Sequence, residues 1–162
     1  TESEFSTSAT TRSPRSGEED GRDYHFFERD EFEAKVRAGQ VLEWAEYGGH
    51  LYGTLRTEVA PVLASGTNVI LDIENEGAKQ IRESFPSAIL IFIGPPSHDE
   101  LARRLRGRGD TAAGDVTERL SVAAAQMAEA PDVYDHVIVN DDLNAAITSV
   151  LDILTARAPV DP

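Results

Sequence analysis

Apolar and polar positions along the chain follow two different spacings in turn, which predict strands and helices that alternate. Continuous apolar runs at residues 68–73, 88–93 and 136–139 are typical of strands buried in a parallel sheet. Shorter strands are predicted at residues 6–10, 24–27, 41–47 and 50–54. Helical spacing lies between them, at residues 30–39, 57–65, 76–84, 97–105, 115–129 and 143–156. The pattern therefore predicts an α/β fold with parallel strands.

The segment 41–47 alternates strictly between its two faces. The expected faces are Val41, Glu43, Ala45 and Tyr47 on one side and Leu42, Trp44 and Glu46 on the other. Gly48 and Gly49 predict a hairpin turn into the return strand. A solvated strand face is the simple alternative for a glutamate in such a pattern.

Two helix starts carry a recognisable capping pattern. Asp30 with Glu33, and Ser97 with Glu100, have the spacing of a capping box, in which a side chain at each end satisfies a free backbone N–H group. We expect both helices to begin at these residues.

Length, charge and residue types narrow the possible functions. A chain of 162 residues suits one domain with a buried core. Its net charge of -14 argues against binding to the phosphate backbone of DNA or RNA. The absence of cysteine excludes disulfides and cysteine nucleophiles, and no apolar run is long enough to span a membrane. The N-terminus does not resemble a signal peptide, so the expected location is cytoplasmic.

A loop that follows the first predicted strand has the composition of an anion site. Arg12 and Arg15 flank Pro14, which stiffens the backbone and disfavours a helix at Ser13. Planar guanidinium groups held in this way match the oxygens of a phosphate. A solvated polar loop is the alternative interpretation.

A second group of arginines lies near residue 105. Four of the thirteen arginines fall in one short run, Arg103, Arg104, Arg106 and Arg108. In an acidic protein such a cluster favours a small anionic ligand, although it also fits the polar face of a helix. Polar residues follow the predicted buried strands, where ligands of parallel sheets bind. They are Asp72, Glu74, Asn140 and Asp141.

Taken in order, five segments make the chain resemble the guanylate kinase family over most of its length. They read STSATTRSPRSGEEDGRDYHF, GQVLEWAEYGGHLYGT, NVILDIENEGAKQIR, ELARRLRGRGD and HVIVNDDL. The resemblance implies transfer of the γ-phosphoryl group of ATP to GMP, with Mg²⁺. The net charge and the short apolar runs argue against nucleic-acid and membrane partners. It also implies a P-loop nucleoside-monophosphate-kinase-like α/β fold, a parallel sheet flanked by helices with a small mixed-sheet GMP-binding subdomain and a lid.

The resemblance implies boundaries and residue roles as well. Residues 1–162 would be one domain, with a GMP-binding region at about 8–67, a core at 68–105 and 120–157, and a lid at about 106–119. The guanine pocket would comprise Ser8, Glu43, Thr54 and Glu74. The GMP phosphate would be bound by Arg12, Arg15, Tyr24 and Tyr52. The lid would supply the catalytic arginines Arg104, Arg108 and Arg119, Asp72 would hold Mg²⁺ through water, and Asn140 would lie on the adenine side. The two tyrosines could instead be core residues.

The sequence departs from the family pattern in one major respect. The family's first strand and G-x-x-x-x-G-K-[ST] phosphate loop are missing, and neither Lys35 nor Lys79 follows a glycine. The first residue, Thr1, is not methionine, so we expect a missing N-terminal segment to supply this loop and the chain alone to be inactive. Loss of the central strand should leave strand edges open and weaken the fold. A smaller departure is Glu74-Asn75-Glu76 in place of the family's Asp-x-Gln.

Two other functions remain open on the sequence. One is a catalytically dead guanylate-kinase-like module that binds GMP or phosphorylated peptides through the retained anion site. The other is a kinase for a different nucleoside monophosphate. The sequence does not specify an oligomeric state.

Overall fold

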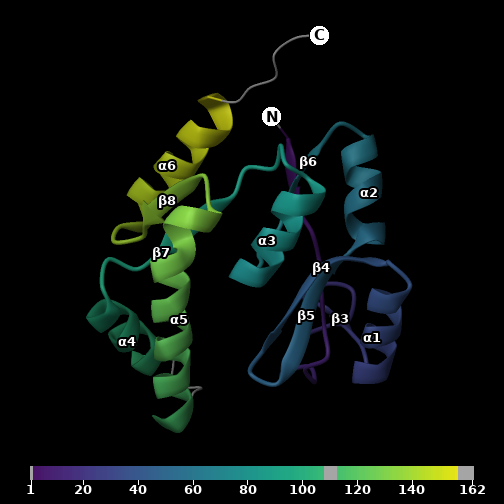
Figure 1. Ribbon diagram of the computed structural model, residues 1–162, viewed down its shortest axis with the longest axis horizontal. Coiled ribbons are helices and arrows are strands. Elements are labelled where there is room, and N and C mark those ends of the chain that lie inside the picture. The colour runs from purple at the N-terminus through teal and green to yellow at the C-terminus, as the bar shows by residue number, and fades with distance from the viewer. Residues whose placement is uncertain (1, 108–112, 157–162) are drawn as a thin grey trace. The chain divides into compact units, whose positions relative to one another are not determined.

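In the computed structural model of the protein, the described residues are 2–107 and 113–156 (Figure 1). The chain separates into two compact units, Thr1–Ala88 and Ile89–Pro162. Among the described residues the first unit has two sheets and the second has one, and the chain combines helices with parallel and mixed strand pairing. This architecture confirms the predicted α/β class, whereas the single domain and its subdivisions stay a prediction.

The first unit contains a mixed sheet with the strand order β3-β2-β5-β4 and a separate parallel pair, β1 with β6. β2 is parallel to β3 and antiparallel to β5, which is antiparallel to β4. Its elements are β1 Ser3–Phe5, β2 Ser8–Thr10, β3 His25–Phe26, α1 Arg29–Arg37, β4 Val41–Tyr47, β5 His50–Leu55, α2 Arg56–Ala64, β6 Asn68–Ile70 and α3 Asn75–Ser84. The small mixed sheet was expected for the GMP-binding region.

Helix α1 covers one face of the mixed sheet (Figure 1). Phe32 of α1 is fully buried and packs with apolar side chains of three strands. The cluster consists of Ala9, Phe32, Val41, Leu51 and Leu55, with Phe27 and Val36 packed against it. Burial of a large aromatic side chain is a main stabilising contribution to a unit of this size. The opposite face of the sheet is left for other contacts.

Strand β4 contains one residue more than its partner β5. Val41 pairs with Leu55 and Glu43 pairs with the adjacent Thr54, so Leu42 is the extra residue of a β-bulge. The bulge places Val41 in the core beneath α1 and Glu43 on the opposite face. The prediction that these two side chains share a face was wrong, because strict alternation assumes one partner for every residue.

The hairpin between β4 and β5 follows the prediction. Gly48 and Gly49 have φ values of +58° and +79°, the left-handed conformation that a tight hairpin turn requires. The predicted strand 6–10 is shorter than expected, because only Ser8–Thr10 form β2, and a separate strand, β1 at Ser3–Phe5, precedes Ser6 and Thr7.

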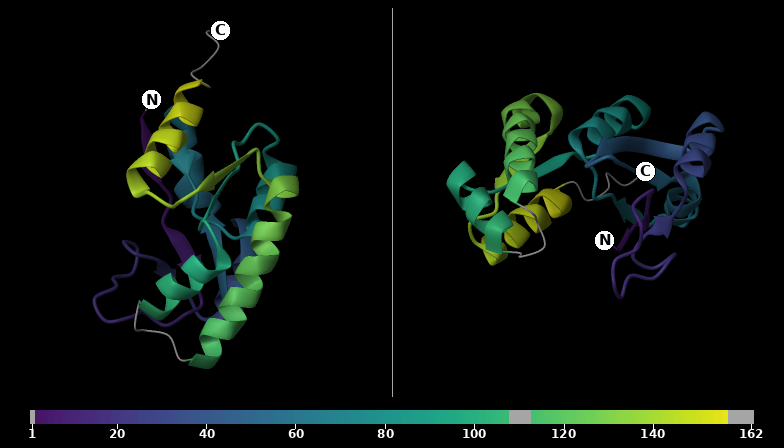
Figure 2. Two further views of the ribbon diagram at one scale, coloured as in Figure 1. Left: turned by 90° about the vertical axis from the view of Figure 1, so that its left-hand side faces the viewer. Right: turned by 90° about the horizontal axis from the view of Figure 1, so that it is seen from below.

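The second unit contains the parallel pair β7 with β8 and three helices. Its elements are β7 Ile91–Gly94, α4 His98–Gly107, α5 Ala113–Val133, β8 His136–Val139 and α6 Leu143–Ala156. Helix α5 is a single long helix, green in Figure 2. Asp135 anchors the start of the pair, because its carboxylate accepts a 2.8 Å bond from Leu90 N–H while its own N–H donates to the Leu90 carbonyl at 2.9 Å.

The three apolar runs predicted as buried strands are shorter or more exposed than expected. β6 ends at Ile70 because β1 ends at Phe5, and the last bond of the pair runs from Ser6 N–H to Ile70 O at 3.1 Å. Ile93 of β7 and Val137 of β8 are 53% and 52% exposed. Within the described residues, β6 pairs only with β1 and β7 pairs only with β8.

The two predicted capping boxes have different outcomes. Ser97 Oγ accepts a 3.2 Å hydrogen bond from Glu100 N–H, which confirms the start of α4. Helix α1 begins one residue before Asp30, with Glu28 as its N-cap and no side-chain capping bond. The prediction for Asp30 was wrong because residue 30 already lies in the first turn. Among the described residues, no helix is long and apolar enough to cross a membrane.

Candidate functional site

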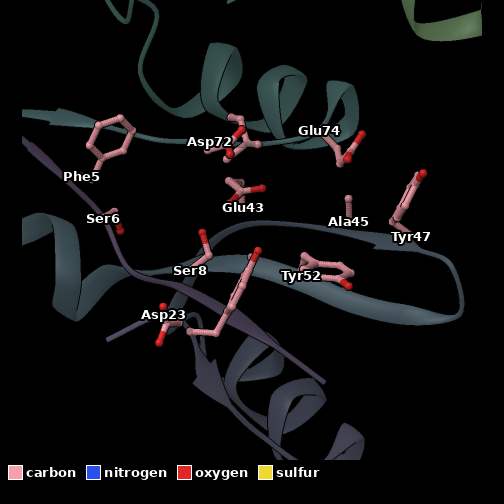
Figure 3. A pocket seen from close by; sticks show the side chains of 13 residues that line it. Phe5, Ser6, Ser8, Asp23, Glu43, Ala45, Tyr47, Tyr52, Asp72 and Glu74 are labelled. Atoms are coloured by element: carbon pink, nitrogen blue, oxygen red, sulfur yellow. The ribbon is translucent and has the colours of Figure 1, made fainter. Parts of the chain in front are cut away.

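A cavity of about 400 Å³ lies in the first unit, on the face of the mixed sheet opposite α1 (Figure 3). Residues from β2, β4, β5 and the segment between β6 and α3 contribute to it. Its lining comprises Phe5, Ser6, Ser8, Asp23, Tyr24, Glu43, Ala45, Tyr47, Tyr52, Gly53, Asp72, Ile73 and Glu74. Six of these residues were predicted from the sequence: Ser8, Tyr24, Glu43, Tyr52, Asp72 and Glu74.

The strand register aligns three predicted residues across the sheet. Ser8 of β2 pairs with Thr54 of β5, which pairs with Glu43 of β4. Directly opposed residues on one sheet face lie close enough for their side chains to interact. Thr54 Oγ1 donates a 2.6 Å hydrogen bond to Glu43 Oε1. Thr54 thus acts behind the cavity wall, where it holds the carboxylate.

Glu43 is a buried acid that accepts a hydrogen bond from Thr54. The residue is 3% exposed. Burial raises the pKa of its carboxyl group above the ordinary value of 4.5, and the hydrogen bond from Thr54 opposes that rise. A buried acceptor of this kind favours a ligand that brings hydrogen-bond donors into the cavity.

An aromatic group forms another part of the cavity wall. The rings of Tyr24 and Tyr52 meet edge to face with centroids 6.3 Å apart. The Arg12 guanidinium lies 5.4 Å from the Tyr24 centroid and 5.9 Å from the Phe26 centroid. Tyr52 also contributes, through a hydrogen bond, to a raised pKa of Arg12. Arg12 is therefore grouped with both predicted tyrosines, although its own side chain is not part of the cavity lining.

Glu18, a residue that the sequence did not single out, fixes the orientation of Arg12. Arg12 Nη1 and Nη2 donate to the two Glu18 oxygens at 2.9 Å each, and Nη1 also donates to the Ser13 carbonyl at 2.8 Å. The bond to Glu18 is the largest cause of the raised pKa of Arg12, and it lowers the pKa of Glu18 below 4.5. The backbone N–H of Arg15 donates to Glu18 at 2.7 Å. The Arg15 side chain is exposed and does not line the cavity.

Two acidic residues reach the cavity from the segment that follows β6. In Figure 3, Glu43 lies between Asp72 and Ser8, while Glu74 lies towards Tyr47. Glu74 is the N-cap residue of α3, where a negative charge is favoured by the helix dipole. Among the described residues, no group of three or more acidic, His or Cys side chains could hold a metal. A single carboxylate such as Asp72 fits Mg²⁺ that keeps most of its water ligands.

Sequence reasoning missed about half of the cavity lining. Ala45 and Tyr47 share the strand face of Glu43, so the alternation already contained the signal for them. Ser6 carries a buried hydroxyl for which the described residues offer no hydrogen-bond partner. No sequence pattern distinguished it from the neighbouring hydroxyl residues. The others missed are Phe5, Asp23, Gly53 and Ile73.

The remaining predicted residues belong to the second unit. Glu100 binds Arg103 and Arg104 of α4 at 2.6 and 2.7 Å, and these bonds lower the pKa of Glu100 to about 2. Arg119 lies in α5, and Asn140 follows β8, where its N–H donates to the Gly94 carbonyl at 2.7 Å. Arg108 lies outside the described residues. Their roles towards a nucleotide stay a prediction.

The α/β architecture and the acidic, tyrosine-lined cavity together define a nucleoside-monophosphate-kinase-like protein. The model of the guanylate kinase family matches residues 1–157. The guanylate kinase of Synechococcus sp. (strain CC9902) is 48% identical over 155 residues, which cover 96% of this chain and 82% of that protein. The guanylate kinase of Rubrobacter xylanophilus is 47% identical over 93% of this chain and 78% of that protein. The chain belongs to the guanylate kinase family, as its sequence segments indicated.

A solved structure supports the same assignment. The crystal structure of guanylate kinase from Anaplasma phagocytophilum superposes with a TM-score of 0.80 at 34% identity, covering 95% of this chain and 75% of that one. The similarity in fold therefore extends over nearly the whole chain.

Proposed function

We propose that the cavity is the GMP site of an ATP-dependent guanylate kinase. The alignment of Ser8, Thr54 and Glu43 across three strands, in a cavity also lined by Tyr24 and Tyr52, is the observation that carries the proposal. Relatives that are 46–49% identical to this chain are guanylate kinases by name, which supports this acceptor over other monophosphates.

The guanine base fits the buried carboxylate by its hydrogen-bonding pattern. The Watson–Crick edge of guanine presents N1–H and an amino group side by side, and an ionised carboxylate accepts from both. Adenine lacks this pair of donors, so it would leave Glu43 buried and unpaired. Sites of this type reject a ligand without the required donors by roughly 10⁴-fold. Ser8 and Glu74 would complete the polar contacts to the base.

The phosphate of GMP would bind where Tyr24, Tyr52 and Arg12 come together. Arg12 Nη1 donates to Glu18 and Ser13 and Nη2 donates once to Glu18, so Nε–H and the second Nη2–H are the donors that would face a phosphate. Two phenol hydroxyls and one fixed guanidinium would hold the GMP phosphate dianion so that one of its oxygens can attack the γ-phosphorus of ATP in line. Arg15 would approach from the same loop.

Transfer of phosphate requires parts beyond the acceptor site. Asp72 would hold Mg²⁺ through water, and the metal would neutralise charge on the donor phosphates. We assign Arg104, Arg108 and Arg119 to the lid and Asn140 to the adenine side. These 162 residues contain no G-x-x-x-x-G-K-[ST] loop, so transfer would need that loop from a preceding segment.

Calorimetry of the chain with nucleoside monophosphates tests the acceptor site. We expect GMP to bind and AMP to bind at least about a hundredfold more weakly, because Glu43 would stay unpaired. Equal affinity for GMP and AMP, or no binding of GMP, would contradict the proposal.

A coupled assay with ATP and GMP tests the need for the loop. Residues 1–162 alone should show no turnover above background, whereas the same residues joined to a family strand–loop–helix segment should transfer phosphate. Turnover by residues 1–162 alone would show that the loop is dispensable.

A phosphopeptide-binding module is the second candidate, because Arg12 with Tyr24 and Tyr52 would suit any phosphomonoester. The buried Glu43 argues against it, since a peptide has no use for an acceptor in that position. A phosphoserine peptide that bound while GMP did not would favour this alternative.

A further inference from the structure

Helix α3 packs against β4, and Gly77 of α3 lies beside the buried carboxylate of Glu43. An ideal Cβ at position 77 would overlap Glu43 Oε2 and lie 3.0 Å from Glu43 Cδ. Glycine is unfavourable relative to alanine in the interior of a helix. The space taken up by the Glu43 carboxylate gives a physical reason for a glycine at this position.

The two oxygens of Glu43 have different neighbours. Thr54 holds Oε1 through its 2.6 Å hydrogen bond, whereas Oε2 lies against Gly77. A methyl group at position 77 would therefore displace the oxygen that Thr54 does not hold. Because Oε2 is the end of a flexible side chain, the displacement would alter the carboxylate and spare the backbone.

Gln80, one turn further along α3, holds the backbone of the residue next to Glu43. Trp44 N–H donates to Gln80 Oε1 at 3.2 Å, and Gln80 Nε2 donates to the Trp44 carbonyl at 2.7 Å. This pair of bonds resembles the pairing that an adjacent strand would provide. It fixes the position of β4 relative to α3 beside the carboxylate.

We propose that Gly77 and Gln80 are positioning residues that set guanine selectivity: Gly77 leaves the space for the Glu43 carboxylate, and Gln80 fixes the strand that carries it. The inference rests on the proposed function, in which this carboxylate binds guanine. Correct placement matters because the carboxylate must meet two adjacent N–H donors at once, and a shift misaligns at least one of them.

The test compares the affinities of Gly77→Ala and the unmodified chain for GMP and for IMP, which keeps N1–H but lacks the amino group. We expect Gly77→Ala to weaken GMP binding by about tenfold to a hundredfold, as for loss of a hydrogen bond to a charged group. The preference for GMP over IMP should fall with it. Glu83→Ala, which places an alanine at an exposed position of the same helix α3, is the control and should change neither quantity.

A double-mutant cycle separates positioning from a general loss of structure. In a Glu43→Ala background, Gly77→Ala should no longer affect GMP affinity, because the displaced group is gone. Thermal unfolding should show that Gly77→Ala is folded. If it is not folded, Gln80→Met, which removes both bonds to Trp44, should lower the preference for GMP over IMP.

The outcomes distinguish the two proposals. If the unmodified chain binds GMP and Gly77→Ala binds it with equal affinity and preference, the positioning role is wrong while the GMP site stands. Additive effects of Gly77→Ala and Glu43→Ala on GMP affinity would also overturn the positioning role. Failure of the unmodified chain to bind GMP would overturn both the proposed function and this inference.

Discussion

Thr54 Oγ1 donates a 2.6 Å hydrogen bond to Glu43 Oε1, and both residues are almost completely buried. The bond joins opposed positions of β4 and β5 directly after the bulge at Leu42. It partly offsets the cost of burying the carboxylate and leaves the second oxygen beside Gly77. The acidity and the placement of Glu43 therefore depend on the same contact.

Thr54→Val should weaken the binding of both GMP and guanosine. The change keeps the shape of the side chain but leaves Glu43 without its hydroxyl donor, so we expect affinities about tenfold lower, as for a lost bond to a charged acceptor. Calorimetry with both ligands measures the effect. Thr57→Val on the exposed surface of α2 is the control and should bind normally. Unchanged guanosine binding by Thr54→Val would contradict the role of the hydroxyl.

Glu43→Gln should make the protein more stable at pH 7 while it weakens GMP binding. Burial raises the pKa of Glu43 in the folded state above 4.5. At pH values between 4.5 and this raised pKa, the folded state therefore keeps a proton that the unfolded state has lost. The free energy of unfolding therefore falls as pH rises from 4.5 through the folded-state pKa and is lowest above it. A neutral glutamine at position 43 does not ionise, so it removes this pH-dependent loss of unfolding free energy.

Urea unfolding of both proteins at a series of pH values between 4 and 8 measures this contribution. The difference in unfolding free energy between Glu43→Gln and the unmodified chain should grow with pH and then level off. A variant that is less stable than the unmodified chain at pH 7 would show that the buried charge is compensated elsewhere.

Arg12→Lys should weaken GMP binding by about tenfold to a hundredfold while guanosine binding is unchanged. A lysine keeps the positive charge, but its single ammonium group lacks the planar fork of N–H groups. It therefore cannot both bind the two Glu18 oxygens and present further N–H groups to a phosphate in a fixed direction. Arg37→Lys, on the exposed face of α1, is the control. Equal losses for GMP and guanosine would mean that Arg12 supports the fold and not the phosphate.

Gly53→Ala should destabilise the first unit. A Cβ at Gly53 would lie 2.5 Å from the Glu43 carbonyl oxygen, 3.0 Å from Trp44 Cβ and 3.1 Å from Phe32 Cζ. Backbone atoms cannot move aside without disturbing the pairing of β4 and β5, so we expect a loss of about 1–3 kcal/mol in unfolding free energy. Urea unfolding measures the loss. A Gly53→Ala variant as stable as the unmodified chain would show that the strands can separate at low cost.

Much of the order of helices and strands followed from the sequence because local patterns act over a few residues. β4, β8 and α6 have the predicted bounds, and Gly48 with Gly49 formed the expected turn. Five sequence segments indicated the family, and six residues predicted for the site line one cavity. Residue types and their spacing carry this information without any knowledge of distant partners.

The tertiary structure decided the features that depend on contacts between distant segments. The bulge at Leu42 set the face of Glu43, because a strand's register is fixed by its partner as well as by its own alternation. Glu18 was one of several loop acids until the fold brought it against Arg12. Gly77 likewise resembled an ordinary helix glycine, and only the packing of α3 on β4 showed that the Glu43 carboxylate fills the space of its missing side chain.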